Sequence, residues 1–376
     1  MKTNRILSSL VTAVVLLSAG VQARCETIPA TDGRVTIIGR TQATDGTVSF
    51  DWTGVYVKVR FQGSSLCVKL SDTNKNYYNV WIDSPMSQAP CKVISTSGQD
   101  TTICLFSQEQ LKELFGRKGA RAPHQVILQK RTEGFQGCTT LQEFTTDGIF
   151  LQADAPSDRV IEYIGDSYTC GYGTEATHKD RFSPETENQN LTYACATARY
   201  FGAEQLVTAH SGMGIARNYD GKNTEDNMAA RYLKTFDRQD APDWTPAPNG
   251  PKPAITVIYL GTNDFSTGMQ PAQRVFVRNY IKLLKEIKAF YGEEHPVLCM
   301  APKHDILIFE YIKKAVDTCN LPAVHILGLS PSVHNDVEDM GADGHPNYSG
   351  HKKIAYSLIP YISTLTGWEM TASPVE

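Results

Sequence analysis

Three short polar motifs each follow an apolar stretch, and together they could hydrolyse an ester. Gly-Asp-Ser at residues 165–167 comes directly after the apolar segment 160–164, which gives Ser167 a defined position. A serine hydroxyl is a weak nucleophile at neutral pH, so it needs a base and hydrogen-bond donors for the developing oxyanion. Gly-Thr-Asn-Asp at 261–264 and Asp-Gly-His-Pro at 343–346 supply candidates for both. Because the functional crevice of an open α/β sheet lies beyond the carboxyl ends of its strands, we expect the motifs to converge there.

His345 is the expected general base, which takes the proton from Ser167 and returns it to the departing hydroxyl. His334 lies in the same predicted loop and is the main alternative, but it lacks the flanking Asp and Pro that would fix its backbone. We expect His210 to be a structural histidine. His351 falls in a predicted helix beside two lysines, and we expect it to be solvated.

Two aspartates accompany this pair. Asp343, two positions before His345, could accept a hydrogen bond from the imidazole and fix its tautomer. A solvated turn aspartate explains the same residue equally well. Asp166 is a poorer nucleophile than Ser167, because its carboxylate would form a labile anhydride with an ester, and we expect it to orient the loop.

The oxyanion needs donors that are in place before the reaction begins. The candidates are the backbone N–H groups of Ser167 and Gly212 and the side-chain amide of Asn263. A glycine at 212 allows close approach of the backbone, and Gly214 is a possible substitute. Asn263 could instead cap a turn. We expect residues 217–219 to brace the glycine-containing segment 211–214.

Aromatic residues near the motifs could line a substrate pocket. Tyr168, Tyr259, Phe265 and Trp244 are candidate walls for an acyl group or a sugar ring, although aromatic side chains more often pack in cores.

The residues before about 151 predict a β-sandwich, because short runs rich in Val, Ile, Phe and Tyr alternate with turn residues. The expected strands are 48–52, 55–61, 66–70, 79–83, 125–130 and 148–153, with one helix at 107–115. The polar segment Ala-Asp-Ala-Pro-Ser-Asp-Arg at 153–159 separates two compositional regimes. We therefore expect a β-sandwich domain over residues 24–153 and a second domain over 160–370.

Strands and helices alternate in the second part, which predicts a parallel sheet with helices on both faces. The expected strands are 160–164, 205–209, 255–260, 297–300 and 324–327, and the expected helices are 191–201, 275–290, 306–319 and 348–365.

The net charge and the N-terminal residues indicate which partners and which cellular location to expect. The net charge of −4 over 376 residues gives no broad positive field, so no nucleic-acid partner is expected. Lys2 and Arg5 precede the apolar stretch 6–17, and small residues at 21 and 23 predict a signal peptide over residues 1–23. That stretch is too short to span a bilayer, so we expect an exported protein, periplasmic or extracellular, without stable membrane insertion.

The nine cysteines fit an oxidising compartment, and each half could hold its own disulfides. Their odd number leaves at least one thiol unpaired. The sequence contains no Cys-x-x-Cys pair, so it does not indicate a zinc site. No glycine-rich nucleotide motif follows a strand. We expect no cofactor, no metal and no obligate protein partner.

The motifs occur in the order found in the SGNH (GDSL-type) hydrolases, which the second half resembles. This likeness is carried by residues 165–167, 211–214, 261–264 and 343–346. It implies a flavodoxin-like three-layer α/β/α domain in which Ser167 forms an acyl-enzyme.

Motifs in the β half make the resemblance more specific, to a single esterase family. Gly-Arg-Thr at 39–41, Lys-Arg-Thr-Glu at 130–133 and the segment 210–219 make the whole mature chain resemble carbohydrate esterase family two. The resemblance implies a jelly roll followed by an esterase domain that removes acetyl groups from plant polysaccharides. SGNH enzymes typically place their acid three residues before the histidine, where this chain has Ala342, and some members of the family use a backbone carbonyl instead.

We therefore predict a serine esterase that removes O-acetyl groups from xylan, glucomannan or their oligosaccharides. One alternative is a lipase or thioesterase that uses the same residues on longer acyl chains. Another is a glycan-binding protein without catalysis. The β domain alone does not decide between them, because sandwiches serve many functions.

Overall fold

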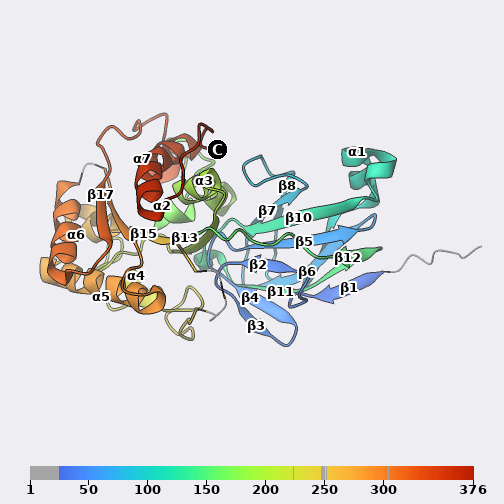
Figure 1. The fold of residues 1–376 in the computed structure, drawn as a ribbon, viewed down its shortest axis with the longest axis horizontal. Helices are drawn as coiled ribbons and strands as arrows, with labels where there is room; N and C mark the ends of the chain where they lie inside the picture. Colours follow the sequence, from blue (N-terminus) through green and yellow to red (C-terminus); the bar gives the residue numbers. More distant parts are fainter. Residues whose placement is uncertain (1–24, 223, 247–249, 251, 304) are drawn as a thin grey trace, which may run out of the picture.

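From Glu26 to Leu151 the chain forms antiparallel strands and one α-helix, and parallel strands with helices begin at Val160 (Figure 1). The structure is a computed structural model that describes residues 25–222, 224–246, 250, 252–303 and 305–376. The predicted signal peptide, residues 1–23, lies outside these residues. The two regimes form two bodies that lie side by side and are joined by one segment before β13.

The first half is a sandwich of two antiparallel sheets. One sheet has the order β3-β4-β11-β6-β9, with β1 paired to β11, and the other has the order β12-β5-β10-β7-β8, with β2 paired to β5. The elements are β1 (Glu26–Pro29), β2 (Thr36–Ile38), β3 (Gln42–Thr44), β4 (Thr47–Phe50), β5 (Tyr56–Gln62), β6 (Leu66–Asp72), β7 (Tyr77–Ile82), β8 (Lys92–Ser95), β9 (Thr101–Phe106), α1 (Gln108–Gly119), β10 (Pro123–Lys130), β11 (Thr139–Thr146) and β12 (Ile149–Leu151).

Alternation along the strands builds the core of this sandwich. In β6, Leu66, Val68 and Leu70 are fully buried while the residues between them are partly exposed, as a period of two requires. The facing sheet contributes Val57, Val59 and other apolar residues to the same core cluster. The predicted β-sandwich is confirmed.

The sequence did not predict β11, although this strand pairs with three others. Its residues, Thr-Thr-Leu-Gln-Glu-Phe-Thr-Thr, are mostly polar. A β-bulge between Leu141 and Glu143 shifts the register, so that Leu141 and Phe144 both reach the core at a spacing of three. This spacing hides the strand from a search for period-two alternation.

The second half is a five-stranded parallel sheet in the order β14-β13-β15-β16-β17. Its strands are β13 (Val160–Gly165), β14 (Glu204–Ala209), β15 (Ile255–Tyr259), β16 (Val297–Ala301) and β17 (Val324–Gly328). Its helices are α2 (Ser167–Cys170), α3 (Tyr193–Tyr200), α4 (Met228–Arg231), α5 (Gln273–Tyr291), α6 (Ile306–Cys319) and α7 (Tyr348–Thr366).

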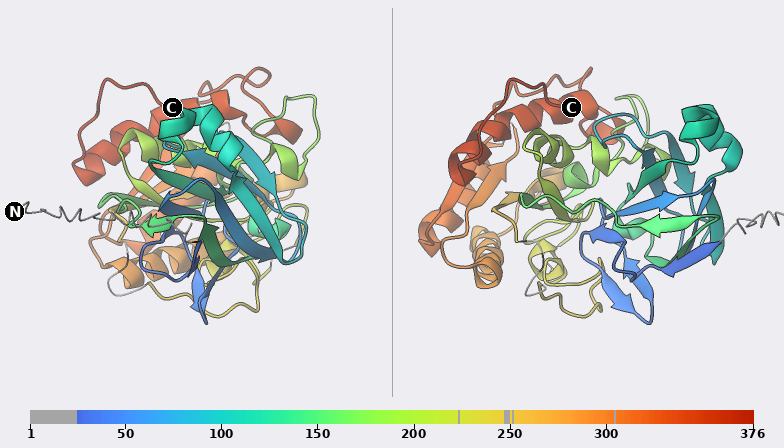
Figure 2. Two further views of the ribbon diagram at one scale, coloured as in Figure 1. Left: turned by 90° about the vertical axis from the view of Figure 1, so that its right-hand side faces the viewer. Right: turned by 45° about the vertical axis from the view of Figure 1, so that its right-hand side comes forward.

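Helices cover both faces of this sheet (Figure 2). One face packs on α4, α5 and α6, and the other packs on α3 and α7. The predicted three-layer α/β/α architecture is confirmed. Counted within the sheet, the strand order is 2-1-3-4-5, so the order reverses between β13 and β15, and ligands of such sheets bind at that point.

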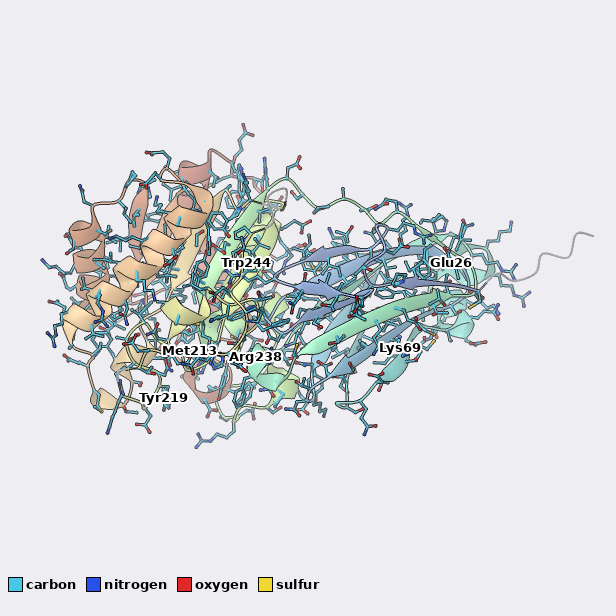
Figure 3. The ribbon with its side chains drawn as sticks, turned by 90° about the horizontal axis from the view of Figure 1, so that it is seen from below. Glu26, Lys69, Met213, Tyr219, Arg238 and Trp244 are labelled. Carbon is cyan, nitrogen blue, oxygen red and sulfur yellow. The ribbon has the colours of Figure 1, made fainter. Side chains whose placement is uncertain are left out.

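Buried polar contacts fix the two halves to each other. The indole N–H of Trp52 donates to the carbonyl of Thr235 at 3.0 Å, and both Arg40 and Glu162 of a 3.5 Å ion pair are buried. The Arg40 guanidinium also lies 3.8 Å from the ring centre of Trp244. Figure 3 shows Trp244 at this junction.

All nine cysteines are free thiols, so the disulfides that the sequence allowed in each half are not formed. Cys67 and Cys104 are direct partners in the register of β6 and β9. Within the described part of the chain, no helix is both long and apolar enough to cross a membrane.

Candidate active site

Ser167 sits at the turn where β13 passes into α2. Gly165 permits this turn, since a Cβ at that position would lie 2.0 Å from Oγ1 of Thr169. The Asp166 side chain caps α2 by accepting from the N–H of Tyr168 at 3.2 Å, which matches its expected orienting role. Ser167 itself is 7% exposed, so its hydroxyl is fixed but reachable.

His345 meets Ser167 from the loop that precedes α7. Its Nε2 lies 2.8 Å from Oγ of Ser167, although 178 residues separate the two along the chain. The backbone on both sides is fixed, because His345 donates its N–H to the carbonyl of Ala342 and accepts from the N–H of Gly341. Burial lowers the pKa of His345 to about 4, so the imidazole is neutral at pH 7 and can accept a proton.

The carboxylate of Asp343 does not contact the imidazole. It accepts from the guanidinium of Arg181 at 2.9 Å, the N–H of Phe182 at 3.0 Å and the hydroxyl of Tyr172 at 3.4 Å. Nδ1 of His345 is buried and has no hydrogen-bond partner among the described residues. Weak backbone interactions with Ala342 and Asp343 oppose the lowering of its pKa. The geometry therefore separates Asp343 from the Ser-His pair.

Aromatic rings hold the imidazole where an acid would otherwise do so. Tyr172 lies against His345 with ring centroids 4.3 Å apart, and Phe182 stacks on the other face of Tyr172 at 3.9 Å. Tyr168 approaches the imidazole edge-on at 5.3 Å. No sequence pattern indicates Tyr172 or Phe182, because a stack of rings from separate segments has no fixed spacing.

The expected oxyanion donors come from three loops at the carboxyl edge of the sheet. Asn263 follows β15, and its side-chain amide donates to Asp166 at 3.2 Å and to the carbonyl of Met213 at 3.0 Å. Gly212 follows β14 with a φ of +82°, which favours glycine. Its N–H donates to no other described residue, but Gly212 is not among the residues that line the pocket of Ser167 and His345.

Asp264 anchors the loop that contains Gly212. Its carboxylate accepts from the N–H groups of Ile215, Ala216 and Arg217 at 2.8, 2.7 and 3.1 Å. Burial raises the pKa of Asp264 to about 6, and these three N–H groups oppose the rise. The Arg217 guanidinium donates back to the carbonyl of Asp264 at 2.7 Å, so Arg217 does brace the loop.

Gly214 is not placed as a substitute donor. Its N–H already donates to the side chain of Asn218 at 3.2 Å. A Cβ at this position would lie 2.3 Å from both the carbonyl of Arg217 and the carboxylate of Asp264, so packing alone requires glycine here.

One pocket of about 490 Å³ brings Ser167, Asn263 and His345 together. Three of the expected aromatic walls line it, namely Tyr168, Tyr259 and Phe265. Further lining residues are Tyr219, Thr262, Ser266, Thr267, Pro302, Lys303, Asp305, Ile308, His334, Met340, Asp343 and Gly344. Trp244 was expected to be a wall and is not one, because it packs on Arg40 and Phe290 at the junction of the halves.

The other histidines have distinct surroundings. His210 binds Asp237 through Nδ1 at 2.7 Å, as expected of a structural histidine. His334 lines the same pocket as His345, but the hydrogen bond to the serine comes from His345. The expectation that His351 is solvated was wrong. This residue is fully buried, because α7 turns it toward the rings of Tyr168 and Tyr193.

Comparison with known families divides the chain into the same two parts. Residues 37–154 match the carbohydrate esterase 2 N-terminal family, and residues 163–353 match the GDSL-like lipase/acylhydrolase family.

Three similar proteins extend this result. The cellulase/esterase CelE of Acetivibrio thermocellus is 30% identical over 328 residues, which cover 84% of this chain but only 38% of that protein. An acetylxylan esterase / glucomannan deacetylase of Cellvibrio japonicus is 27% identical, and the match covers 85% of this chain and 86% of the relative. The structure of a family two carbohydrate esterase from Clostridium thermocellum in complex with cellohexaose superposes with a TM-score of 0.77 at 28% identity, covering 89% of this chain and all of that one.

Proposed function

We propose that this chain, which belongs to the GDSL-like lipase/acylhydrolase family, is a serine esterase. In this proposal it removes O-acetyl groups from polysaccharides such as xylan or glucomannan, or from their oligosaccharides. The observation that carries this proposal is the 2.8 Å contact between Oγ of Ser167 and Nε2 of His345. It lies inside a pocket that also holds the amide of Asn263. A nucleophile, a base and an oxyanion donor thus share one opening.

In the first half-reaction, the hydroxyl oxygen of Ser167 attacks the acetyl carbonyl while His345 takes the hydroxyl proton. The tetrahedral intermediate then collapses, the sugar oxygen leaves with that proton, and acetyl-Ser167 remains. In the second half-reaction, water attacks the acyl-enzyme with His345 again as the base, and acetate and free Ser167 are released. No step requires an oxidant, a reductant or a second substrate other than water.

Three donors stabilise the oxyanion in this scheme: the N–H groups of Ser167 and Gly212 and the amide of Asn263. The Gly212 N–H has no acceptor among the described residues, so it loses no hydrogen bond when it donates to the oxyanion. The Asn263 amide must exchange one of its present acceptors, Asp166 or the carbonyl of Met213, for the oxyanion. Donors fixed before the reaction give such a site most of its rate enhancement.

Under this proposal Asp343 is not the primary partner of His345. Its carboxylate is held by Arg181 and Phe182, and the imidazole lies against the ring of Tyr172. Among the described residues, neither the Asp343 carboxylate nor a backbone carbonyl accepts a hydrogen bond from Nδ1 of His345.

The similar proteins support the proposed substrate class. One is an acetylxylan esterase / glucomannan deacetylase, and a solved neighbour is a family two carbohydrate esterase bound to cellohexaose. We further propose that residues 24–153 and 160–370 are separate domains, and that residues 1–23 direct export to the periplasm or the extracellular space. A polymeric substrate outside the cell would require such export.

Acetate release from acetylated xylan and acetylated glucomannan tests the proposal. The native protein should release acetate from at least one of them, and Ser167→Ala should fall to background. Preference for p-nitrophenyl octanoate over the acetate would instead indicate a lipase or thioesterase. Polysaccharide binding with no turnover by the native protein would indicate a glycan-binding protein.

A further inference from the structure

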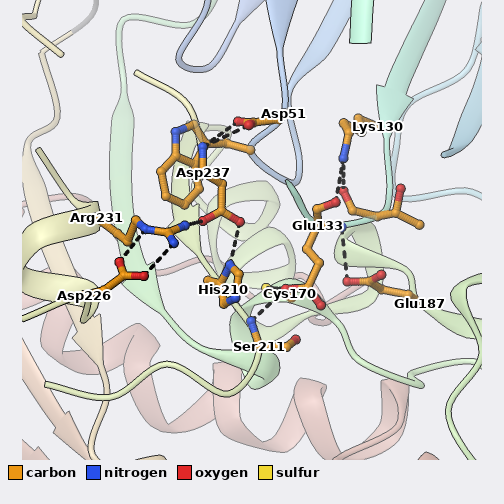
Figure 4. Close-up of polar contacts among 12 residues, drawn as sticks. Asp51, Lys130, Glu133, Cys170, Glu187, His210, Ser211, Asp226, Arg231 and Asp237 are labelled. Carbon is orange, nitrogen blue, oxygen red and sulfur yellow. Dashed lines mark hydrogen bonds and ion pairs between the residues drawn. The ribbon is translucent and has the colours of Figure 1, made fainter. Parts of the chain in front are cut away.

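The buried carboxylate of Glu133, in the first half, contacts the loop of the second half that contains Ser211 and Gly212 (Figure 4). Oε2 of Glu133 accepts from the backbone N–H of Ser211 at 2.7 Å. Glu133 is 2% exposed and lies just before the short 3-10 helix η1 (Gly134–Gln136), far from the catalytic motifs in sequence. Ser211 directly precedes Gly212, whose N–H is a proposed oxyanion donor.

The same carboxylate also contacts the element that carries the nucleophile. Cys170, the last residue of α2, places its sulfur 3.7 Å from Oε2 of Glu133. Ser167 is the first residue of that helix. One oxygen of Glu133 therefore lies between the loop of Gly212 and the helix of Ser167, the two backbone segments that supply oxyanion N–H groups.

The backbone of Glu133 is fixed from both sides, so its side chain has a rigid base. The buried ammonium of Lys130 donates to the carbonyls of Thr132 and Glu133 at 2.6 and 2.9 Å. The N–H of Glu133 donates to Oε1 of Glu187 at 3.2 Å. At the next residue the halves approach so closely that a Cβ on Gly134 would lie 2.5 Å from the Cβ of Asp237.

A second buried carboxyl group, that of Glu187, lies beside Glu133. Glu187 is fully buried, and burial together with the neighbouring Glu133 raises its pKa well above the usual range. A hydrogen bond from a backbone N–H to a charged acceptor is stronger than one to a neutral acceptor.

We propose that Glu133 is a positioning residue for the oxyanion hole. Its carboxylate holds the peptide of Ser211, and through it the N–H of Gly212, in the orientation that the tetrahedral intermediate requires. The β half is then part of the catalytic unit, because it supplies the group that aligns a donor in the other half. This inference rests on the proposed esterase function and adds a role for the β half to it.

Two near-isosteric variants separate positioning from packing. Glu133→Gln keeps an acceptor oxygen for Ser211 but removes the charge, whereas Glu133→Met keeps the length and removes the acceptor. With p-nitrophenyl acetate, kcat of Glu133→Gln should fall threefold to tenfold, the difference between a charged and a neutral acceptor. Glu133→Met should fall about a hundredfold, as when an oxyanion donor is lost. KM should stay within twofold for both variants, because the ground state does not use this donor.

Trp52→Phe is the matched control. It also removes one buried hydrogen bond between the halves, from the indole of Trp52 to Thr235, but it does not touch the loop of Gly212. It should lower the midpoint of thermal unfolding and leave kcat unchanged at 25 °C. A merely structural role for Glu133 predicts that its variants behave like this control.

Equal kcat for Glu133→Met and Glu133→Gln, or changes confined to KM, would overturn the inference. If Glu133→Met does not fold, Glu133→Gln alone decides, because wild-type kcat in that variant contradicts a charged positioning contact. The native protein and Ser167→Ala are assayed in parallel. No difference between those two would refute the esterase proposal itself, whereas an active native protein with unaffected Glu133 variants would refute only this inference.

Discussion

The ring of Tyr172 lies against the imidazole of His345, with centroids 4.3 Å apart and planes inclined by 33°. Nδ1 of the same imidazole has no hydrogen-bond partner among the described residues. Phe182 supports Tyr172 from behind, with its ring 3.9 Å away and almost parallel. Stacking thus takes over part of the orientation that a carboxylate provides in a Ser-His-Asp triad.

Replacement of Tyr172 by Leu should lower kcat about tenfold, because an imidazole free to tilt spends less time aligned with Ser167. Tyr172→Phe is the control. It keeps the ring but loses the hydroxyl that reaches Asp343, and kcat should stay within twofold of wild type. Steady-state kinetics on p-nitrophenyl acetate measure both. Wild-type kcat in Tyr172→Leu would show that the ring does not orient the base.

Removal of the Asp343 carboxylate should have a modest effect. In the structure it binds Arg181 and Phe182 and not the imidazole, so Asp343→Asn should lower kcat by less than about tenfold. A triad aspartate costs about 10⁴ when it is replaced by asparagine. A loss of a thousandfold or more on the same substrate would mean that Asp343 turns to His345 during the reaction.

The acid limb of the pH profile should lie unusually low. Only the neutral imidazole accepts the proton of Ser167, and burial lowers the pKa of His345 to about 4. The active form therefore persists as the pH falls through 6.5, the ordinary value, and kcat/KM should be halved only near pH 4. A half-point near 6.5 would contradict the buried environment of the base.

Folding must be followed in the same buffers, because buried histidines also make stability depend on pH. Burial lowers the pKa of His351 to about 3. Below pH 6.5 this imidazole is therefore protonated in the unfolded chain but stays neutral in the folded chain. Stability from this residue is complete above 6.5 and is lost as the pH falls toward 3. Circular dichroism at each pH distinguishes loss of fold from protonation of His345.

The convergence of Ser167, Asn263 and His345 could be predicted from the sequence, because each follows or lies near a strand of a parallel sheet. The strand order was not needed for that step. The carboxyl ends of all parallel strands meet at one edge, and the observed reversal between β13 and β15 places Ser167 and Asn263 beside each other.

The contacts that tune the site could not be predicted, since they depend on distant segments. Asp343 is drawn away from the imidazole by Arg181, which lies 162 residues earlier in the chain. Glu133 belongs to the β-sandwich half and contacts Ser211 of the α/β half across their junction. The burial of His351 depends on which face of α7 packs on the sheet, and the lysines beside it indicated the opposite.

Tyr219 offers the clearest test of how a polymer is held outside the acetyl pocket. It lines the pocket and is 63% exposed, so much of the residue is open to a sugar. Figure 3 shows Tyr219 near the edge of the molecule. Its backbone is fixed by a 2.7 Å hydrogen bond from its N–H to the carbonyl of Gly212, so truncation of the ring should leave the oxyanion loop in place.

Tyr219→Ala should raise KM for acetylated xylan or glucomannan threefold to tenfold, the effect of losing a ring contact worth about 1 kcal/mol. KM for p-nitrophenyl acetate should rise less, because this small ester has no sugar to stack. Tyr361→Ala is the matched control, since Tyr361 is also an exposed tyrosine, 42% exposed, but lies on α7 and does not line the pocket. Equal increases of KM for the polymer and the small ester would place Tyr219 in acyl binding and not in glycan binding.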